Sequence, residues 1–239
     1  MRFVAEMSKI PGKLTVGDFD IALFHGGDGA RESPLVCLLT GQEDGGAIFE
    51  TALEAGSGEF LMAAIPVADW DDALSPWRAP QPFRGGTDFG GGADAFLKML
   101  ESRLLPEIRA AFSAPDAPCY LAGYSLAGLF SVYALYRSTA FAGAASVSGS
   151  LWFPDFADYT AAHTPLQRPE RVYFSLGDRE SRTRNPLLRR TEDVTRALCE
   201  SFCASGTESV FERNPGGHFK EPEKRTARGI TWLVRGGRI

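Results

Sequence analysis

The chain has 239 residues with a net charge of −5, and 44% of its residues are hydrophobic while 23% are charged. This length and apolar content allow one α/β domain over residues 1–239, because single domains of about 200 to 250 residues are common. The negative charge provides no basic surface for a phosphate backbone, which argues against nucleic acid as a partner.

The apolar runs and the cysteines of the sequence indicate where the protein is located and whether it binds a metal. No apolar run approaches the roughly 20 residues that span a bilayer, and residues 1–9 lack the apolar core of a secretion signal. We therefore expect a cytoplasmic protein that does not bind membranes. The cysteines at 37, 119, 199 and 203 have no further ligands nearby to complete a metal set. We expect reduced thiols, no metal and no organic cofactor.

The predicted elements begin with a hairpin and continue as alternating strands and helices. Apolar runs at 14–16 and 19–24 flank Gly17-Asp18, which suits a tight antiparallel turn. From Leu35 onward, short apolar strands alternate with longer helical stretches, which is typical of a mostly parallel sheet covered by helices on both faces. Strands are predicted at 35–40, 60–67, 120–124, 143–147, 171–176 and 209–213. Helices are predicted at 47–55, 93–112, 126–137, 187–204 and 221–234.

The helix predicted at 93–112 has one apolar stripe, formed by every fourth residue from Phe96 to Phe112. This stripe is expected to pack on the sheet. Pro106 lies within it, so we expect a kink or a break, with a new turn that starts at the proline.

Residues 69–92 show little periodicity and contain Trp70, Trp77, Phe83 and Phe89 among prolines and glycines. Long irregular segments within a compact domain are usually functional or mobile. We expect this segment to form one wall of a pocket, with its aromatic rings supplying apolar surface.

Ser125 lies between the strand at 120–124 and the helix at 126–137, and Gly123 and Gly128, two residues before it and three after it, have no side chain. A serine on such a strand-to-helix turn can be the nucleophile of a sharp elbow that exposes its hydroxyl. Serine also commonly caps the N-terminus of a helix. This stretch alone supports both interpretations.

A serine nucleophile needs a base, and His218 is the best placed of the three histidines. It lies in a glycine-rich loop between the last strand and the last helix, on the carboxyl side of the predicted sheet. His163 lies in an irregular connection and is the second candidate.

A carboxylate must orient the histidine, and the strand at 171–176 is followed by two, Asp178 and Glu180. Either choice gives the order serine, acid, histidine that is found in α/β-hydrolases. Glu180 is preferred for its longer reach, whereas Asp178 more naturally braces the turn. The oxyanion is expected to bind the amides of Leu126, at the start of its helix, and of Gln42, beside Gly41.

Taken together, these residues resemble the putative esterase family of α/β-hydrolases, which includes esterase D-like enzymes, enterochelin-esterase-like siderophore hydrolases and related acyltransferases. The resemblance covers most of the chain from Leu35 onward. It rests on Leu39-Thr40-Gly41, Gly123-Tyr124-Ser125-Leu126-Ala127-Gly128, Ser148-Gly149-Ser150-Leu151-Trp152, Ser175-Leu176-Gly177-Asp178-Arg179-Glu180 and Gly216-Gly217-His218-Phe219.

The resemblance implies an α/β-hydrolase fold and a small-molecule ester substrate. The family's nucleophile, acid and histidine would fall on Ser125, Glu180 and His218, and its oxyanion donors on Gln42 and Leu126. Trp152 is similar to an aromatic residue near the family's acyl or alcohol site, and Trp77 is a further candidate for contact with substrate.

One departure from the common elbow pattern is Ala127, which stands where glycine is usual, so we expect the helix to lie slightly farther from the strand. The prediction is a serine hydrolase that cleaves an ester or lactone through an acyl-enzyme. The alternatives are acyl transfer on the same fold and a non-catalytic binding module.

Overall fold

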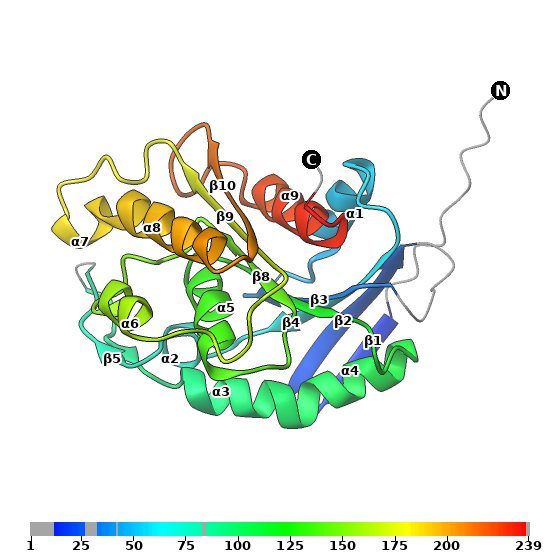
Figure 1. Ribbon diagram of the computed structural model, residues 1–239. Coiled ribbons are helices and arrows are strands. Elements are labelled where there is room, and N and C mark those ends of the chain that lie inside the picture. The colour runs from blue at the N-terminus through cyan, green and yellow to red at the C-terminus, as the bar shows by residue number, and fades with distance from the viewer. Residues whose placement is uncertain (1–11, 27–32, 42, 83–84, 238–239) are drawn as a thin grey trace.

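The computed structural model describes residues 12–26, 33–41, 43–82 and 85–237. Its main sheet has the strand order β1-β2-β4-β3-β7-β8-β9-β10 (Figure 1). β1 and β2 form an antiparallel hairpin, β2 is antiparallel to β4, and the other neighbours are parallel. The predicted fold class is therefore confirmed. The strands are β1 (Gly12–Val16), β2 (Phe19–Gly26), β3 (Leu35–Thr40), β4 (Phe60–Pro66), β7 (Cys119–Tyr124), β8 (Gly143–Val147), β9 (Arg171–Gly177) and β10 (Glu208–Asn214).

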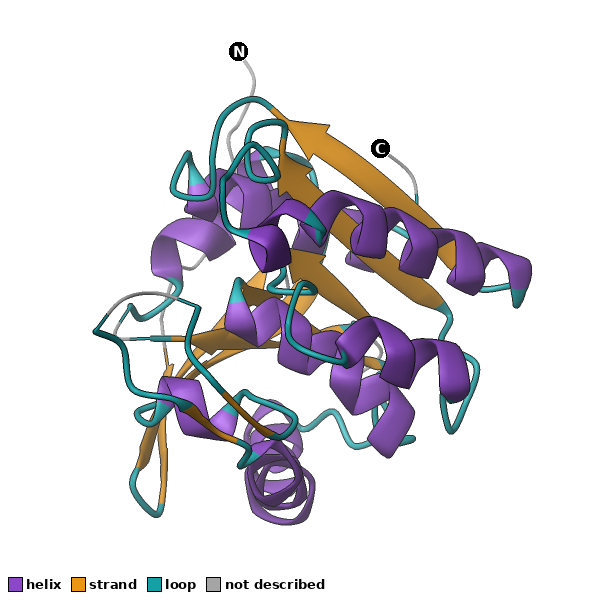
Figure 2. Ribbon diagram, turned by 90° about the vertical axis from the view of Figure 1, so that its left-hand side faces the viewer, coloured by secondary structure: helices purple, strands orange, loops and turns teal. Residues whose placement is uncertain are grey.

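Helices cover both faces of this sheet, as Figures 1 and 2 show. α1 and α9 lie side by side on one face, and α3, α4, α5 and α8 pack on the other. The helices are α1 (Gly46–Glu54), α2 (Trp70–Ala73), α3 (Ala93–Met99), α4 (Leu105–Phe112), α5 (Leu126–Arg137), α6 (Phe156–Ala162), α7 (Pro186–Arg189), α8 (Thr191–Ala204) and α9 (Pro222–Val234).

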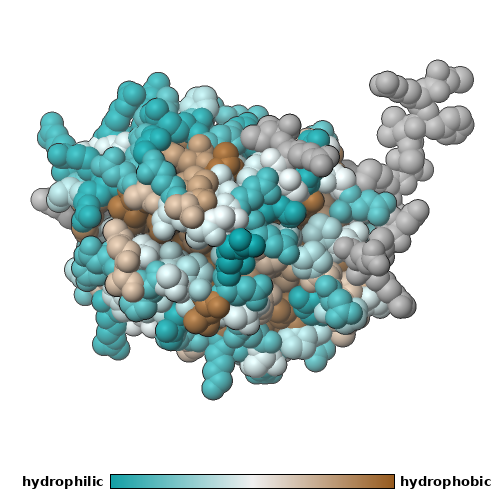
Figure 3. All heavy atoms as spheres, viewed as in Figure 1, coloured by the Kyte–Doolittle hydropathy of each residue, from teal (hydrophilic) through white to brown (hydrophobic). Residues whose placement is uncertain are grey.

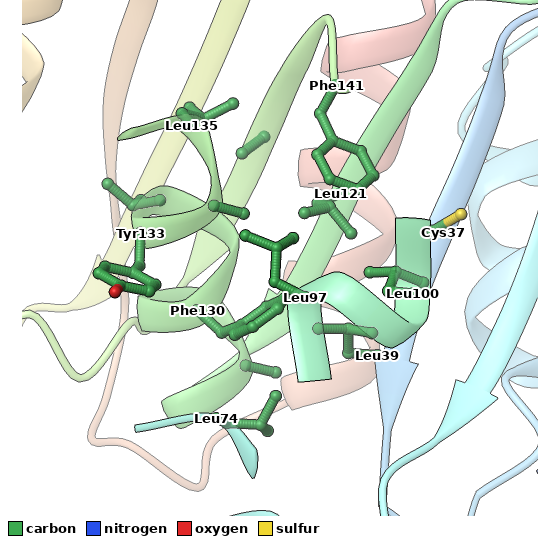
Figure 4. Close-up of a cluster of buried hydrophobic side chains, with 14 of the residues drawn as sticks. Cys37, Leu39, Leu74, Leu97, Leu100, Leu121, Phe130, Tyr133, Leu135 and Phe141 are labelled. Carbon is green, nitrogen blue, oxygen red and sulfur yellow. The ribbon is translucent and has the colours of Figure 1, made fainter. Parts of the chain in front are cut away.

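The central strands read as continuous apolar runs because both of their faces are buried. In β3, Cys37 and Leu39 point into the core beneath α3 and α5, whereas Val36 and Leu38 point into the core beneath α1 and α9. Figure 4 shows Leu39 and Leu121 from the sheet meeting Leu97 and Phe130 from the covering helices. Each central strand is thereby held between two cores.

The helix predicted at 93–112, which carries the apolar stripe, changes its winding before Pro106. A π-helical turn, Leu100–Leu104, joins α3 to α4, and Pro106 lies in the first turn of α4. Proline removes one backbone donor and crowds the preceding turn, which a local π-helical turn accommodates. The new helical segment expected at the proline begins one residue before it, at Leu105, and the chain stays helical throughout, so the alternative of a break is wrong.

Three regions of the chain differ from the sequence predictions. The helix predicted at 187–204 is divided at Arg190 into α7 and α8. The helix α6 was not predicted; it is short, and its N-cap residue Asp155 has a left-handed backbone with φ of 62°. Within the irregular segment 69–92, the chain forms α2 and a small antiparallel pair, β5 (Arg78–Ala79) and β6 (Phe89–Gly90).

The surface of the molecule is mixed in character. The face seen in Figure 3 is mostly hydrophilic, and its hydrophobic residues lie in small separate patches. Among the residues that the structure describes, no helix is both long and apolar enough to cross a membrane.

Candidate active site

Ser125 lies at the junction of β7 and α5, with φ of 58° and ψ of −118°. These angles are unfavourable for a residue with a side chain, and such strain persists only where the surroundings hold it. The Ser125 amide donates to the Val147 carbonyl at 3.0 Å, and the Ser125 carbonyl accepts from the Ser150 amide at 2.9 Å. Neighbouring strand and loop backbone therefore fix the turn.

The elbow is tight because its flanking residues are small. A Cβ atom at Gly123 would lie 2.5 Å from the Cβ of Ala127, so a side chain cannot be placed there without moving the helix. Ala127 itself is fully buried. The missing side chain of Gly123 on the strand thus leaves space for the methyl group of Ala127 on the helix, where glycine is usual.

Ser125, His218 and Glu180 come together as one hydrogen-bonded line. His218 Nε2 lies 3.1 Å from Ser125 Oγ, and His218 Nδ1 lies 2.8 Å from Glu180 Oε2. Because an ionised carboxylate only accepts, the proton of a neutral imidazole is on Nδ1, which leaves Nε2 to accept from the serine hydroxyl. Ser125 is at the N-cap position of α5, yet its side chain makes no capping hydrogen bond. The geometry fits a nucleophile better than a cap.

Glu180 is held by three donors besides the histidine. Its Oε1 accepts from the Gly177 amide at 2.6 Å, from Ser148 Oγ at 2.8 Å and from Arg225 Nη1 at 3.2 Å. Burial by itself would raise the pKa of this carboxyl, but the hydrogen bonds from His218, Gly177 and Ser148 outweigh it and lower the pKa below its usual value. Glu180 is therefore ionised at neutral pH.

Asp178 has a different set of contacts. Its Oδ1 accepts from the Gly216 amide at 2.8 Å, and its own amide donates to the Asn214 carbonyl at 2.8 Å. These bonds join the turn after β9 to the loop that carries His218. Among the described contacts of Asp178, none reaches the imidazole, so the structure places Glu180 and not Asp178 beside the histidine.

Arg225, on the first turns of α9, is a part of this site that sequence reasoning missed. Its side chain is 3% exposed and bonds Glu180. Its Nη2 donates to the carbonyls of Pro215 and Gly217, at 3.0 and 3.1 Å, within the histidine loop. One guanidinium thus ties the acid to the segment that carries the base. The local sequence carried no signal for this role, because arginine is usually exposed.

Tyr124 adds a second tie to the histidine loop. Its hydroxyl donates to the backbone carbonyl of His218 and accepts from Arg225 Nη1 at 3.4 Å. Burial raises the pKa of Tyr124, so the phenol keeps the proton that it donates. The residue directly before the nucleophile therefore also positions the base.

Replacing Arg225 by methionine should lower the free energy of unfolding by about 3–5 kcal/mol, because it leaves the buried Glu180 carboxylate without its cationic partner. We also expect a lower kcat with a smaller change in KM, since the histidine loop loses two hydrogen bonds. Chemical denaturation and steady-state kinetics measure both effects.

A matched control is Arg196→Met, because Arg196 pairs with Glu192 at an exposed position, with side-chain exposures of 51% and 23%. Its expected change in stability is within about 1 kcal/mol. Equal effects of the two substitutions would contradict the assigned role of Arg225.

A cavity of about 290 Å³ opens onto Ser125 and His218. Its apolar wall includes the rings of Trp70, Phe89 and Trp152. Ser150 also lines it and places its Oγ 3.3 Å from the Oγ of Ser125. The irregular segment 69–92 therefore supplies part of the wall, through Trp70 and Phe89.

Not every predicted site residue faces this cavity. Trp77 is not among the lining residues that the structure describes. Its indole Nε1 donates to the Pro154 carbonyl at 3.1 Å, and its ring packs against Phe153 and Tyr159. This aromatic cluster supports the loop after Trp152, so Trp77 acts at most through that loop. His163 is exposed and stacks on Tyr159, with 4.3 Å between ring centroids.

The structure describes one of the two predicted oxyanion donors, Leu126, but not the other. Leu126 lines the cavity at the first position of α5, and its amide has no acceptor among the described residues. The amides of a first helical turn are the ones left without intrahelical partners. Gln42 lies outside the described residues, as does Phe83 of the predicted pocket wall.

The chain is similar to a known family and to known proteins. The family model described as "Putative esterase" matches residues 21–220. The Bacillus subtilis protein YbbA, described as uncharacterised, is 25% identical, with 80% of this chain and 83% of YbbA covered.

Solved structures share the fold at low sequence identity. Siderophore hydrolase EstA from Aspergillus nidulans has a TM-score of 0.73 at 20% identity and is covered to 98%, with 100% of this chain matched. An IroE-like serine hydrolase from Shewanella oneidensis has a TM-score of 0.77 at 16% identity, with 95% of this chain and 80% of that chain covered.

Proposed function

Because the chain belongs to the putative esterase family and is an esterase-type hydrolase, we propose that it cleaves a small-molecule carboxylic ester through a covalent acyl-enzyme on Ser125. The observation that carries this proposal is the continuous line of hydrogen bonds from Ser125 Oγ through His218 to Glu180. The three residues come from loops at the carboxyl ends of β7, β10 and β9. We infer that the sheet and its helices act as one domain.

In the acylation step, Ser125 Oγ attacks the ester carbonyl carbon while its proton moves to His218 Nε2. The carbonyl electron pair moves onto oxygen and forms a tetrahedral oxyanion. When that intermediate collapses, the bond to the alcohol oxygen breaks and the alcohol leaves with the proton from Nε2. The acyl group remains bound to Ser125.

Deacylation repeats this sequence with water. His218 Nε2 takes a proton from water, whose oxygen attacks the acyl carbon, and the second tetrahedral intermediate expels Ser125 Oγ. Oγ recovers the proton from Nε2 and the carboxylic acid leaves. In both steps the ionised Glu180 stabilises the imidazolium and fixes its orientation.

The oxyanion is stabilised by backbone donors in this proposal. The Leu126 amide is at the positive end of α5, where its hydrogen bond and the helix dipole both favour a developing negative charge. The amide of Gln42 stays the proposed second donor. No metal or organic cofactor has a step in this mechanism.

The apolar part of the substrate is proposed to lie against Trp152 and Phe89 in the cavity beside Ser125. Phe219, which follows the histidine and is 91% exposed, lies at the mouth of the same cavity. Trp77 is proposed to hold the Trp152 loop in place and not to contact the substrate.

A fluorophosphonate probe tests the proposed function directly, because it phosphonylates only an activated serine. Wild-type protein should gain the mass of one probe, and peptide mapping should place the adduct on Ser125. A short-chain p-nitrophenyl ester, added first, should slow the labelling by competition. The absence of an adduct, or an adduct on another residue, would refute the assignment of Ser125.

A further inference from the structure

The loop that follows β8 contacts both the acid and the nucleophile of the proposed site. Ser148, its first residue, has a left-handed backbone with φ of 45°, and its Oγ donates to Glu180 Oε1 at 2.8 Å. This hydrogen bond helps to lower the pKa of Glu180. Two residues later, Ser150 places its Oγ 3.3 Å from Ser125 Oγ. The proposed steps of acylation and deacylation give the hydroxyl of Ser150 no role.

Backbone contacts hold Ser150 against the elbow. Its amide donates to the Ser125 carbonyl at 2.9 Å, and its carbonyl accepts from the Phe153 amide at 3.0 Å. The loop can fold back over the end of β8 because Gly149 has no side chain, and a Cβ there would lie 2.1 Å from Ser146 Oγ. Ser150 is 3% exposed. Its hydroxyl is therefore fixed beside the nucleophile by contacts in which the hydroxyl itself has no part.

The direction of the hydrogen bond between the two serines follows from the contacts of the histidine. Neutral His218 has its proton on Nδ1, facing Glu180, so Ser125 donates its hydroxyl proton to His218 Nε2. Ser125 Oγ can then only accept from Ser150, and the Ser150 hydroxyl is the donor. Within the part of the chain that the structure describes, Ser125 is the one hydrogen-bond partner of that hydroxyl.

The charge on Ser125 Oγ changes during the proposed reaction. Oγ is a neutral hydroxyl oxygen before acylation and a neutral ester oxygen in the acyl-enzyme, but it carries partial negative charge while its bond to the acyl carbon forms or breaks. Hydrogen bonds to a charged oxygen are about twice as strong as those to a neutral one. A fixed donor to Oγ therefore stabilises the transition states more than the states on either side, which is the condition for catalysis.

The distance between the two hydroxyl oxygens fits a resting enzyme. At 3.3 Å it exceeds the usual range for hydroxyl donors, which is about 2.5–3.0 Å. Catalytic hydrogen bonds are often long before substrate binds and shorten in the transition-state complex. The bond from Ser150 is thus expected to be weak in the free enzyme and to strengthen as charge develops on Oγ.

The sheet order separates this hydroxyl from the proposed oxyanion donors. β3 and β8 lie on opposite sides of β7. Gln42, the proposed second donor to the oxyanion, follows β3 in the chain, whereas Ser150 follows β8. Ser150 therefore approaches the nucleophile from the other side, and its measured contact is with Oγ.

We propose that Ser150 is a further catalytic residue, whose hydroxyl donates a hydrogen bond to Ser125 Oγ and stabilises negative charge on that oxygen. In acylation, a lone pair of Oγ forms the bond to the carbonyl carbon as the Oγ proton moves to His218 Nε2. In deacylation, the electron pair of that bond returns to Oγ, which regains the proton from Nε2. Ser150 keeps its own proton in both steps. This inference rests on the proposed function and adds a residue to its mechanism.

Ser150→Ala tests this role, because it removes the hydroxyl and keeps the backbone hydrogen bond to Ser125. We expect kcat/KM for p-nitrophenyl butyrate, and the second-order rate constant of labelling by a fluorophosphonate, each to fall by about 10- to 100-fold. Butyl p-nitrophenyl ether has no carbonyl carbon to attack, so its inhibition constant measures binding alone and should match that of the wild type. Thermal unfolding should also match the wild type.

The matched control is Ser146→Ala, which removes another buried serine hydroxyl, from β8 itself. Ser146 Oγ has no hydrogen-bond partner among the described residues, so this variant should react with the ester and the fluorophosphonate as the wild type does.

A double substitution shows through which atom Ser150 acts. On a Ser125→Ala background, Ser150→Ala should cause no further loss of the residual turnover, because the oxygen that it serves is already absent.

The outcomes separate this inference from the function on which it rests. If the wild type neither cleaves the ester nor is labelled on Ser125, the proposed function fails. If the wild type does both and Ser150→Ala reacts as fast as Ser146→Ala, the catalytic role of Ser150 is overturned while the function stands. A loss in Ser150→Ala that is equalled by weaker binding of the ether, or that recurs in full on the Ser125→Ala background, also overturns that role.

Discussion

Replacing Ser125 by alanine is expected to lower kcat/KM for a short-chain p-nitrophenyl ester by about 10⁴-fold or more, because loss of the nucleophile removes the covalent pathway altogether. The same variant should not react with a fluorophosphonate. Circular dichroism and thermal unfolding should match the wild type, since Oγ contacts only the His218 and Ser150 side chains among the described residues and makes no capping hydrogen bond to the helix. Unchanged turnover would refute Ser125 as the nucleophile.

Ser125→Gly separates chemistry from strain at the same position. Both variants lose the hydroxyl, but only glycine adopts a φ of 58° with ψ of −118° without steric cost. The strain at such a residue is of order 1–3 kcal/mol. Part of the stability gained by relieving this strain is lost again in the glycine variant, because glycine has more conformational freedom in the unfolded chain. We expect Ser125→Gly to be more stable than Ser125→Ala by about 1 kcal/mol. Equal stability would show that the turn is not strained.

Glu180→Gln should lower kcat by about 10²–10⁴-fold, because a neutral amide neither stabilises the imidazolium nor reliably selects the tautomer with the proton on Nδ1. Asp178→Asn, an equivalent change two residues away, should have a smaller effect, since Asp178 bonds the Gly216 amide and not the imidazole. The kcat values of the two variants, measured by steady-state kinetics, decide whether Glu180 or Asp178 is the acid. A larger loss in Asp178→Asn would transfer the acid role to Asp178.

The lowered pKa of Glu180 also predicts how the stability difference between wild type and Glu180→Gln changes with pH. A carboxyl whose pKa is lowered on folding stabilises the folded state at pH values above its unfolded pKa, which is near 4.5. This stabilisation is lost as the pH falls through the lowered value. Denaturation at pH 7 and at successively lower pH should therefore show the wild-type advantage diminishing in acid. A stability difference between wild type and Glu180→Gln that does not change with pH would contradict a lowered pKa of Glu180.

The sequence was sufficient for the central sheet, because each central strand lies between two cores. Such a strand appears as an apolar run whose ends are marked by polar or glycine residues, and β3 and β8 begin and end at the predicted residues. The helix α5 was predicted with the same accuracy, since the elbow fixes its start. Short elements such as α6 carry too few residues for periodicity to be read.

The direction of a side chain in an irregular segment was not predictable in the same way. Trp77 and Phe89 are both aromatic residues of the segment 69–92, yet Phe89 lines the cavity and Trp77 bonds Pro154. Nothing in the local pattern distinguishes them, because their orientation is set by packing against α6 and the loop before it. Arg225 was missed for a related reason. Arginine is usually exposed, and its burial is favourable only when Glu180 and the loop carbonyls surround it.

The position of Arg225 also has a consequence for how the site is completed. Glu180, which Arg225 bonds, precedes Arg225 in the chain by 45 residues. His218, whose loop Arg225 holds, precedes it by only seven residues. Strands β7, β8 and β9, which are neighbours in the sheet, all precede residues 218–225 in the chain. These strands alone would present Ser125 without its histidine. In the proposed mechanism ester cleavage needs His218 beside Ser125, so it requires residues 218–225 and α9 to be docked against the sheet.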